Sequence, residues 1–289
     1  MFVVSLFIPL VAGNVFMESS IRRVPEITER QHTPTKTYMI FDPCNTNKPG
    51  NRTISCSQIK MRERSRSGEY VIYPRNDPVN VRCDMESDGG GWTVIQQRTK
   101  YEANDNNFEK NERDYELGFG ASGSSYWIGN ENLHALTSFP NNQQSLRIEL
   151  TRTGEEKPTV VLYHKFHVGS KEEKYKLTID EYEGPDVTGY DALSYHNGEK
   201  FTIKKSMTRT PDKDKCSDRL SGGWWFKECN EANLNGRKFT YTSQTKALGI
   251  TWHIKDKEES YEYIYEKVEM KIRDNDFGFC TGALKSQLT

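Results

Sequence analysis

The sequence predicts an α+β fold built around an antiparallel β-sheet. Short runs rich in β-branched and aromatic residues recur along the chain, and several alternate apolar with polar residues, as half-buried strands do. Two other segments have the pattern of helices. From 184 to 248 the chain is rich in Gly, Asn, Asp and Lys, which predicts a loop-built region. The 289 residues leave room for one large domain or two smaller ones.

The expected elements follow one another in a simple order. Strands are expected over 69–74, 80–85, 92–98, 145–150, 159–168, 175–179 and 268–273. Helices are expected over 106–117 and 130–136. The run WTVIQQR at 92–98 alternates and should have one buried face, and VEMKIR at 268–273 should return to the sheet.

The N-terminal segment indicates export. The first 13 residues, MFVVSLFIPLVAG, have the composition and length of a signal peptide, and they are too short to span a bilayer. The alternative interpretation is a buried N-terminal strand. Residues 14–43 contain Pro25 and Pro34 and lack Gly-X-Y repeats and sustained heptads, so we expect a linker or N-terminal arm. The protein is therefore expected to be secreted and extracellular, without membrane insertion.

Cysteine content agrees with an oxidising, extracellular environment. The six cysteines are Cys44, Cys56, Cys83, Cys216, Cys229 and Cys280. No pair has C-x-x-C spacing, which argues against a zinc site. Asn51, in the sequence Asn51-Arg52-Thr53, is the expected N-glycosylation site. A formal net charge of −1 gives no global attraction to nucleic acid.

Neither the histidines nor the familiar catalytic motifs indicate an enzyme. The histidines are His32, His134, His164, His167, His196 and His253. His164 and His167 fall in one expected strand, where their spacing places them on opposite faces, so they are poor joint metal ligands. The sequence has no GxSxG, HExxH or P-loop motif. We therefore expect a non-enzymatic binding protein.

A cysteine-bounded segment, CSDRLSGGWWFKEC at 216–229, is the most informative part of the sequence. The other distinctive runs are, in chain order, CDMESDGGGWTVIQQR, YWIGNENLHALT, FHVGSKEEKYKLTI, YHNGEKF, NLNG, GITW and VEMKIR. In order and spacing these runs resemble the fibrinogen C-terminal (fibrinogen-related) domain, of the ficolin, tachylectin and techylectin-like secreted lectin type. The resemblance extends from Cys56 to Arg273.

The resemblance implies a fibrinogen C-terminal-like domain over 44–280, followed by a tail at 281–289. Its expected layout is a small N-terminal subdomain, a central twisted antiparallel sheet with flanking helices, and a loop-rich C-terminal subdomain with a ligand pocket. The disulfides that it implies are Cys56–Cys83 and Cys216–Cys229. Cys44 and Cys280 then remain, and either they pair with each other or one of them links to a second polypeptide.

In lectins of this family the pocket beside the cysteine loop recognises acetyl groups, with aromatic side chains around the methyl group. The positions that the resemblance carries over are Leu220, Glu228, Cys229, Asn230, Lys246, Ala247 and Tyr263. Leu220 and Lys246 stand where the family has tyrosines, and Asn230 stands where it often has histidine. Ala247 is retained, and Tyr263 is expected to supply the remaining aromatic wall.

The calcium loop of the family is altered in this protein. The positions that correspond to its calcium-binding aspartates are Lys205, Met207 and Arg209, which cannot ligate calcium. Asp212 and Asp214 have an Asp-x-Asp spacing that is compatible with a calcium-binding loop. Ca²⁺ is therefore expected as a cofactor only if the loop shifts its register so that these two residues take the calcium positions. A second hypothesis is that cations replace the metal, either by stabilising the loop or by attracting sulfated or sialylated glycans; the alternative is a solvated charged loop. These cations are Lys204, Lys205, Arg209, Lys213, Lys215 and Arg219.

These expectations favour a secreted, non-enzymatic recognition protein, with lectin-like binding of glycans or acetylated surface groups in innate defence. One alternative is a protein-binding extracellular factor, similar to fibrinogen or angiopoietin-type domains that bind a peptide or receptor. Another is a secreted toxin-like component. The chain lacks the stem that usually builds multimers, which weakens the lectin interpretation because a single sugar site binds feebly.

Overall fold

The computed structural model describes residues 53–62, 64–102, 107–139, 143–204, 220–228, 230–242 and 247–280. Its centre is a nine-stranded sheet with neighbours in the order β1-β2-β3-β13-β6-β7-β8, in which β5 also pairs β3 and β4 pairs β5. The strands of this sheet are β1 (Gly68–Ile72), β2 (Val79–Asp84), β3 (Trp92–Arg98), β4 (Phe119–Gly120), β5 (Tyr126–Trp127), β6 (Gln144–Arg152), β7 (Thr159–Val168), β8 (Leu177–Glu183) and β13 (Tyr265–Asp274). All of its strand pairs are antiparallel, which confirms the predicted fold class.

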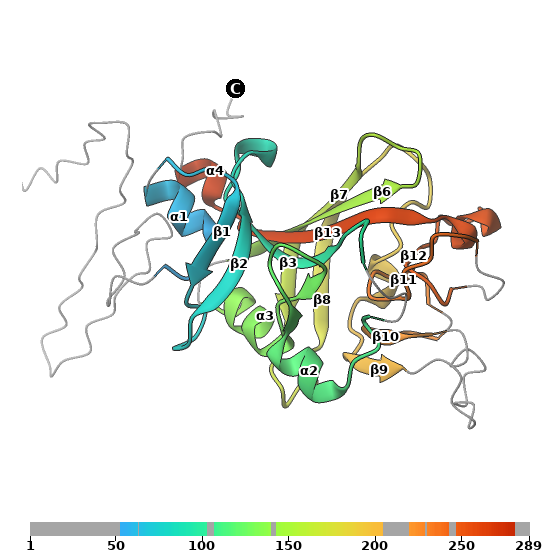
Figure 1. Ribbon diagram of the computed structural model, residues 1–289, viewed down its shortest axis with the longest axis horizontal. Coiled ribbons are helices and arrows are strands. Elements are labelled where there is room, and N and C mark those ends of the chain that lie inside the picture. Colours follow the sequence, from blue (N-terminus) through green and yellow to red (C-terminus); the bar gives the residue numbers. More distant parts are fainter. Residues whose placement is uncertain are drawn as a thin grey trace, which may run out of the picture.

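Short helices flank this sheet. The α-helices of the described residues are α1 (Cys56–Arg62), α2 (Glu112–Leu117), α3 (Asn130–Thr137) and α4 (Phe277–Cys280). Figure 1 shows α1 beside β1 and β2 at one end of the molecule, and β13 crossing the middle of the sheet. The far end of β13 reaches α1, because the backbone N–H of Asp274 donates to Oγ of Ser57 at 3.2 Å.

A disulfide joins the N-terminal helix to the sheet. Cys56 of α1 is bonded to Cys83 of β2, the pairing that the family resemblance implies. The backbone N–H of Cys56 also donates to Oγ1 of Thr93 in β3 (3.0 Å). Cys280 is disulfide-bonded as well, to a residue outside the described ranges. The cysteines outside those ranges are Cys44, Cys216 and Cys229.

The longer strands of the sheet lie near where the sequence predicts them, whereas the two-residue strands β4 and β5 were not predicted. The strand β3 also differs in burial. All of β3 is buried, whereas its alternating pattern predicted one exposed face. Its polar side chains are buried because each has a partner. Those of Gln96 and Arg98 donate to the carbonyl of Leu234 (2.8 and 3.1 Å). Gln97 donates to Glu269 at 3.0 Å. The loop around Leu234 therefore covers the face that was expected to meet water.

The helix expected over 106–117 is shorter than its pattern suggests. It begins at Glu112, because the side chain of Asn111 accepts from the backbone N–H of Asp114 (2.9 Å) and caps the helix. Phe108 precedes the helix and is packed in the hydrophobic core. The second expected helix is confirmed as α3.

After β8 the described residues form only short strands and two 3₁₀ helices, η2 (Ser194–His196) and η4 (Glu258–Glu262), until β13. The short strands are β9 (Thr202–Lys204), β10 (Gly222–Trp224), β11 (Ala232–Asn233) and β12 (Thr251–Trp252). They form two two-stranded sheets, β9 with β10 and β11 with β12, at the opposite end of the molecule from α1 (Figure 1). This confirms the loop-rich C-terminal region. Residues 1–13, 14–43 and 281–289 lie outside the described ranges.

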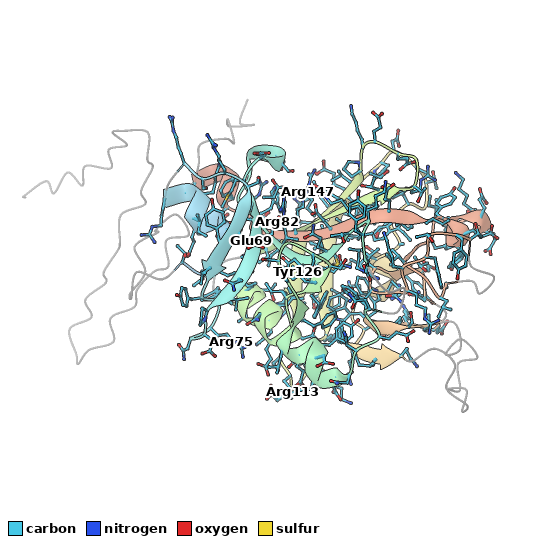
Figure 2. All side chains as sticks on the ribbon, viewed as in Figure 1. Glu69, Arg75, Arg82, Arg113, Tyr126 and Arg147 are labelled. Carbon is cyan, nitrogen blue, oxygen red and sulfur yellow. A yellow bond between two sulfur atoms is a disulfide. The ribbon has the colours of Figure 1, made fainter. Side chains whose placement is uncertain are left out.

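One hydrophobic core extends from the sheet into the loop-rich region. Its largest fully buried side chains include Trp92, Trp127, Trp224, Trp225 and Trp252. Figure 2 shows Tyr126 in the middle of the molecule, whereas Arg75 and Arg113 reach its periphery. No helix within the described ranges has the length and apolar character to cross a membrane.

Candidate functional site

A buried histidine fixes the backbone on both sides of the turn at 226–230. His196 is fully buried, and its Nδ1 donates to the carbonyl of Trp225 (2.7 Å). Its Nε2 accepts from the backbone N–H groups of Glu231 (3.2 Å) and Ala232 (2.9 Å). Accepting at Nε2 requires a neutral ring, and burial lowers the pKa of His196 to about 4. The ring therefore stays neutral at physiological pH and holds this turn in place.

The two adjacent tryptophans form the scaffold behind the turn. Trp224 and Trp225 are fully buried, with ring centroids 5.2 Å apart. Nε1 of Trp225 donates to the carbonyl of Tyr175 (2.7 Å). Gly222 has φ +80°, and a Cβ there would lie 2.5 Å from the carbonyl oxygen of Asn235, so only glycine fits. Neither indole is open to a ligand.

The turn itself has a constrained backbone. Glu228 and Asn230 have φ values of +34° and +48°, in the left-handed region. The backbone N–H of Asn230 donates to the carbonyl of Lys227 (3.0 Å), which closes the turn. Asparagine tolerates this conformation, whereas glutamate rarely adopts it. Backbone strain of this kind occurs preferentially at functional sites.

The Asn230 side chain is completely buried, yet its Oδ1 and Nδ2 have no hydrogen-bond partner among the described residues. An unpaired buried polar group costs about 1–3 kcal/mol. The hydroxyl of Tyr261 donates to the backbone carbonyl of Asn230 (3.3 Å), so an aromatic residue lies next to this amide. The Tyr261 ring stacks on His253 at 4.1 Å between centroids. Burial raises the pKa of Tyr261 to about 12, so its hydroxyl remains a donor.

Leu220 and Ala247 belong to two segments that run side by side. Oγ of Ser221 donates to the carbonyl of Leu248 (3.0 Å). Nδ2 of Asn233 donates to the carbonyl of Ser221 (2.9 Å), which ties these segments to the residues after the turn. Both Leu220 and Ala247 are buried. We call the following residues the cysteine-loop site: Leu220, Glu228, Asn230, Ala247 and Tyr261.

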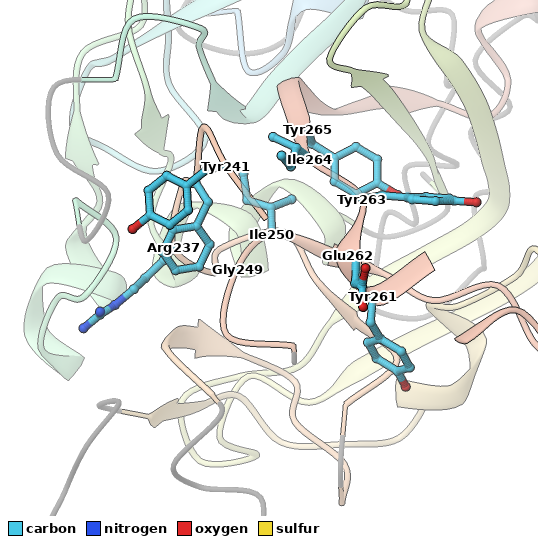
Figure 3. Close-up of a pocket in the computed structure, with 10 residues that line it drawn as sticks. Arg237, Tyr241, Gly249, Ile250, Tyr261, Glu262, Tyr263, Ile264 and Tyr265 are labelled. Carbon is cyan, nitrogen blue, oxygen red and sulfur yellow. The ribbon is translucent and has the colours of Figure 1, made fainter. Parts of the chain in front are cut away.

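The resemblance expects Tyr263 to supply an aromatic wall of the ligand pocket, and this stays a prediction. Tyr263 lines a shallow, open hollow, which we call the aromatic hollow. This hollow is lined by Arg237, Phe239, Tyr241, Gly249, Ile250 and 261–265 (Figure 3). The guanidinium of Arg152 covers the Tyr263 ring at 4.5 Å. Tyr261 was not predicted, because the run YEYIY places tyrosines at 261, 263 and 265 and no pattern shows which one faces the cysteine loop.

Several predicted residues lie outside the described ranges. They are Cys229 and Lys246 of the pocket, Asp212 and Asp214, and the altered calcium positions Lys205, Met207 and Arg209. Within the ranges that the structure describes, no group of three or more His, Cys, Asp or Glu side chains could hold a metal ion. The calcium hypothesis therefore stays a prediction.

Comparison with protein families gives a match over most of the sequence. The family model for "Fibrinogen beta and gamma chains, C-terminal globular domain" matches residues 52–275. Techylectin-5A of Tachypleus tridentatus is 35% identical over 228 residues, which cover 77% of this chain and 74% of that protein. Ryncolin-4 of Cerberus rynchops is 35% identical over 226 residues, 76% of this chain and 60% of that protein. The chain spans only 12% of the tenascin of Gallus gallus, at 36% identity over 240 residues.

Solved structures show the same fold. The fibrinogen-like globe domain of human ANGPTL2 superimposes with a TM-score of 0.65 at 29% identity, covering 77% of this chain and 99% of that one. The lamprey fibrin D-dimer, complexed with the peptide ligand Gly-His-Arg-Pro-amide, superimposes with a TM-score of 0.63 at 26% identity, covering 76% of this chain and 73% of that one.

Proposed function

The protein belongs to the family of C-terminal globular domains found in the beta and gamma chains of fibrinogen, and on that basis we propose that it is a secreted, non-enzymatic recognition protein. The proposed ligands are acetylated groups on extracellular glycans, bound at the cysteine-loop site in innate defence. Techylectin-5A, whose name marks it as a lectin, supports this choice of ligand class.

The observation that carries the proposal is the unpartnered amide of Asn230. An acetamido group offers a carbonyl acceptor and an N–H donor, which are the two partners that this buried side chain lacks. Its methyl group needs an apolar neighbour, and Tyr261, whose hydroxyl donates to the backbone carbonyl of the same residue, is the proposed one. Because this amide is fully buried, binding requires the turn at 226–230 to move aside, and it would then satisfy a polar group and bury a methyl group at one place.

Secretion is supported by the disulfide chemistry. The Cys56–Cys83 bond and the bonded state of Cys280 are typical of an oxidising compartment. We propose that residues 1–13 are removed during export and that Asn51 carries an N-linked glycan. Expression in a eukaryotic cell line should release a protein into the medium whose mass falls after N-glycosidase treatment. Retention inside the cell with an uncleaved N-terminus would contradict both the removal of residues 1–13 and the N-linked glycan at Asn51.

The test of function is retention on an N-acetylglucosamine resin, with calcium or with EDTA. We expect the wild type to be retained and to elute with free N-acetylglucosamine. Asn230→Ala should lose retention, and His164→Ala, which changes an exposed histidine on β7, should not. Retention that survives Asn230→Ala would contradict the proposed site. Release by EDTA would show that calcium takes part and would direct attention to Asp212 and Asp214.

A peptide ligand at the same site is the second candidate. The lamprey fibrin structure holds the peptide Gly-His-Arg-Pro-amide, and angiopoietin-4 of Mus musculus is 38% identical over 201 residues, 68% of this chain and 38% of that protein. A peptide backbone offers the same carbonyl and N–H pair to Asn230. Saturable binding of a fluorescent Gly-His-Arg-Pro-amide, with no competition from N-acetylglucosamine, would favour this function over the glycan.

A further inference from the structure

We propose that the aromatic hollow is a second binding site and that it takes an uncharged sugar ring. Two walls from distant parts of the sequence form it: 237–241 on one side and 261–265 on the other (Figure 3). Phe239 and Tyr241 face each other within the first wall, with ring centroids 5.7 Å apart. Gly249 lies between the walls, and a Cβ there would come within 2.8 Å of the Phe239 ring. Glycine therefore keeps the floor of the hollow open.

The two walls are held in place without a ligand. The backbone N–H of Ile250 donates to the carbonyl of Arg237 (2.9 Å), which fixes the floor against the first wall. Nζ of Lys238 donates to the carbonyls of Tyr265 (2.7 Å) and Glu266, which ties the first wall to the second. A site with fixed walls loses little conformational entropy on binding.

The charges around the hollow select against anionic ligands. Arg237 is neutralised by Glu109, with Nε 2.7 Å from the nearer carboxylate oxygen. Arg152, which covers Tyr263, is likewise paired with Glu155. Glu262 is exposed and forms no ion pair within the described residues. The rim therefore carries a free carboxylate, which repels sulfate or sialic acid and accepts hydrogen bonds from neutral hydroxyl groups.

The exposed aromatic ring of Tyr241 indicates the shape of the ligand. Its side chain is 64% exposed, which is unusual for a large ring at the edge of a hollow. A sugar ring has one apolar face of C–H groups that can pack on such a ring, and hydroxyl groups on its edge for Glu262 and Arg237. The aromatic residues stand on two opposite walls and leave an open gap between them (Figure 3), which suits a flat ring.

Tyr261 connects this hollow with the cysteine-loop site. It lines the hollow, and its hydroxyl also donates to the carbonyl of Asn230 (3.3 Å). A glycan bound at the cysteine-loop site could thus continue into the aromatic hollow with its next sugar, an extension that rests on the proposed function. Binding of a neutral sugar in the hollow alone does not depend on acetyl recognition.

The experiment is a titration of the ¹⁵N-labelled full-length protein with three neutral trisaccharides that lack acetyl groups: cellotriose, maltotriose and mannotriose. We expect at least one to shift the backbone resonances of 237–241 and 261–265. Tyr241→Ala should weaken that binding by about two- to twelvefold, because an aromatic contact of about 0.5–1.5 kcal/mol is lost. Tyr241→Phe should retain it. Tyr70→Ala, on β1 at the other end of the molecule, is the matched control.

Two results would overturn the inference. One is the absence of any shift in the hollow with all three sugars, whatever N-acetylglucosamine does at the cysteine-loop site. The other is tighter binding of a sulfated form of the same trisaccharide, since the unpaired Glu262 carboxylate should disfavour it. Loss of N-acetylglucosamine binding with intact trisaccharide binding would count against the proposed function only.

Discussion

The central sheet and the loop-rich region satisfy their buried polar groups in different ways. In the sheet, neighbouring strands pair their backbone groups over long registers, such as the nine paired positions of β13 and β6. In the loop-rich region, single side chains replace the missing strand partners, and His196 alone bonds three backbone groups. The geometry of the candidate site therefore depends on a few side chains, whereas that of the sheet is shared among many bonds.

Charge is also buried differently in the two regions. In the sheet, Nζ of Lys271 lies 2.8 Å from Asp84, 2.9 Å from Glu149 and 3.1 Å from Glu269. Although burial lowers the pKa of Lys271, the carboxylates of Glu269, Glu149 and Asp84 raise it overall. The loop-rich region buries the neutral His196, and its buried Lys238 bonds backbone carbonyls instead of carboxylates. This difference predicts separate responses to mutation and to pH.

The largest effect is expected in the sheet. Lys271→Met leaves one buried and two partly buried carboxylates without their shared cation, so the free energy of unfolding should fall by about 3–5 kcal/mol. Urea denaturation at pH 7 measures this loss. Lys267→Met is the control, since this half-exposed lysine bonds only Glu269 among the residues that the structure describes, and its effect should stay below about 1 kcal/mol. Equal effects of the two variants would contradict the buried network.

The next effect concerns the loop-rich region alone. His196→Ala leaves the carbonyl of Trp225 and the N–H groups of Glu231 and Ala232 unpaired in the interior. We expect a loss of about 2–4 kcal/mol, together with loss of N-acetylglucosamine retention. His164→Ala should change neither. Hydrogen exchange should accelerate at 220–233 before it does so in β6 and β7, and uniform acceleration would show that the two regions are not independent.

Acidification should separate the two regions in the wild type. The folded pKa of His196, about 4, lies below its unfolded value of 6.5, so the folded state binds fewer protons there. The contribution of His196 to the free energy of unfolding is complete above pH 6.5. It decreases as the pH falls, by about 2 kcal/mol between pH 6.5 and 5. Lys271 lowers the pKa of Glu149, so this carboxylate loses its contribution only below pH 4.5. Unfolding at pH 7, 5 and 4 tests this order, and a stability that is flat from pH 7 to 5 would contradict it.

The smallest effect is expected at the wall of the cysteine-loop site. Ser221→Ala removes one hydrogen bond to the carbonyl of Leu248 (3.0 Å) and should cost about 1 kcal/mol. Because this bond aligns Leu220 with the segment of Ala247, we expect a clear loss of ligand retention even though the loss of stability is small. Ser124→Ala, which removes an exposed bond to Ala121, is the control for stability. A normal affinity in Ser221→Ala would show that this wall does not shape the site.

The same contrast explains what could be predicted from the sequence. Strands such as β6 and β7 follow from local alternation, so their positions were predicted correctly. The complete burial of β3 was not predicted, because Leu234, which covers it, lies far from β3 along the sequence. His196 looked like an ordinary packing residue, since its partners Trp225 and Ala232 lie 29 and 36 positions away.

The candidate site was predicted less completely than the fold. Motif resemblance proposed Asn230 and Ala247, but it could not show that the Asn230 amide lacks a partner among the residues that the structure describes. It assigned the aromatic wall to Tyr263, whereas Tyr261 contacts Asn230. Tyrosines at alternate positions share the same local pattern, and only the packing of 258–262 against the loop distinguishes them. Such choices depend on contacts between distant segments.

The most direct test is hydrogen–deuterium exchange of the wild type with and without N-acetylglucosamine at saturating concentration. If the loop-rich region carries recognition, the sugar should slow exchange at 220–233 and 247–263 and leave 144–168 of the sheet unchanged. Protection confined to the sheet, or none in the loop-rich region with bound sugar present, would contradict this assignment.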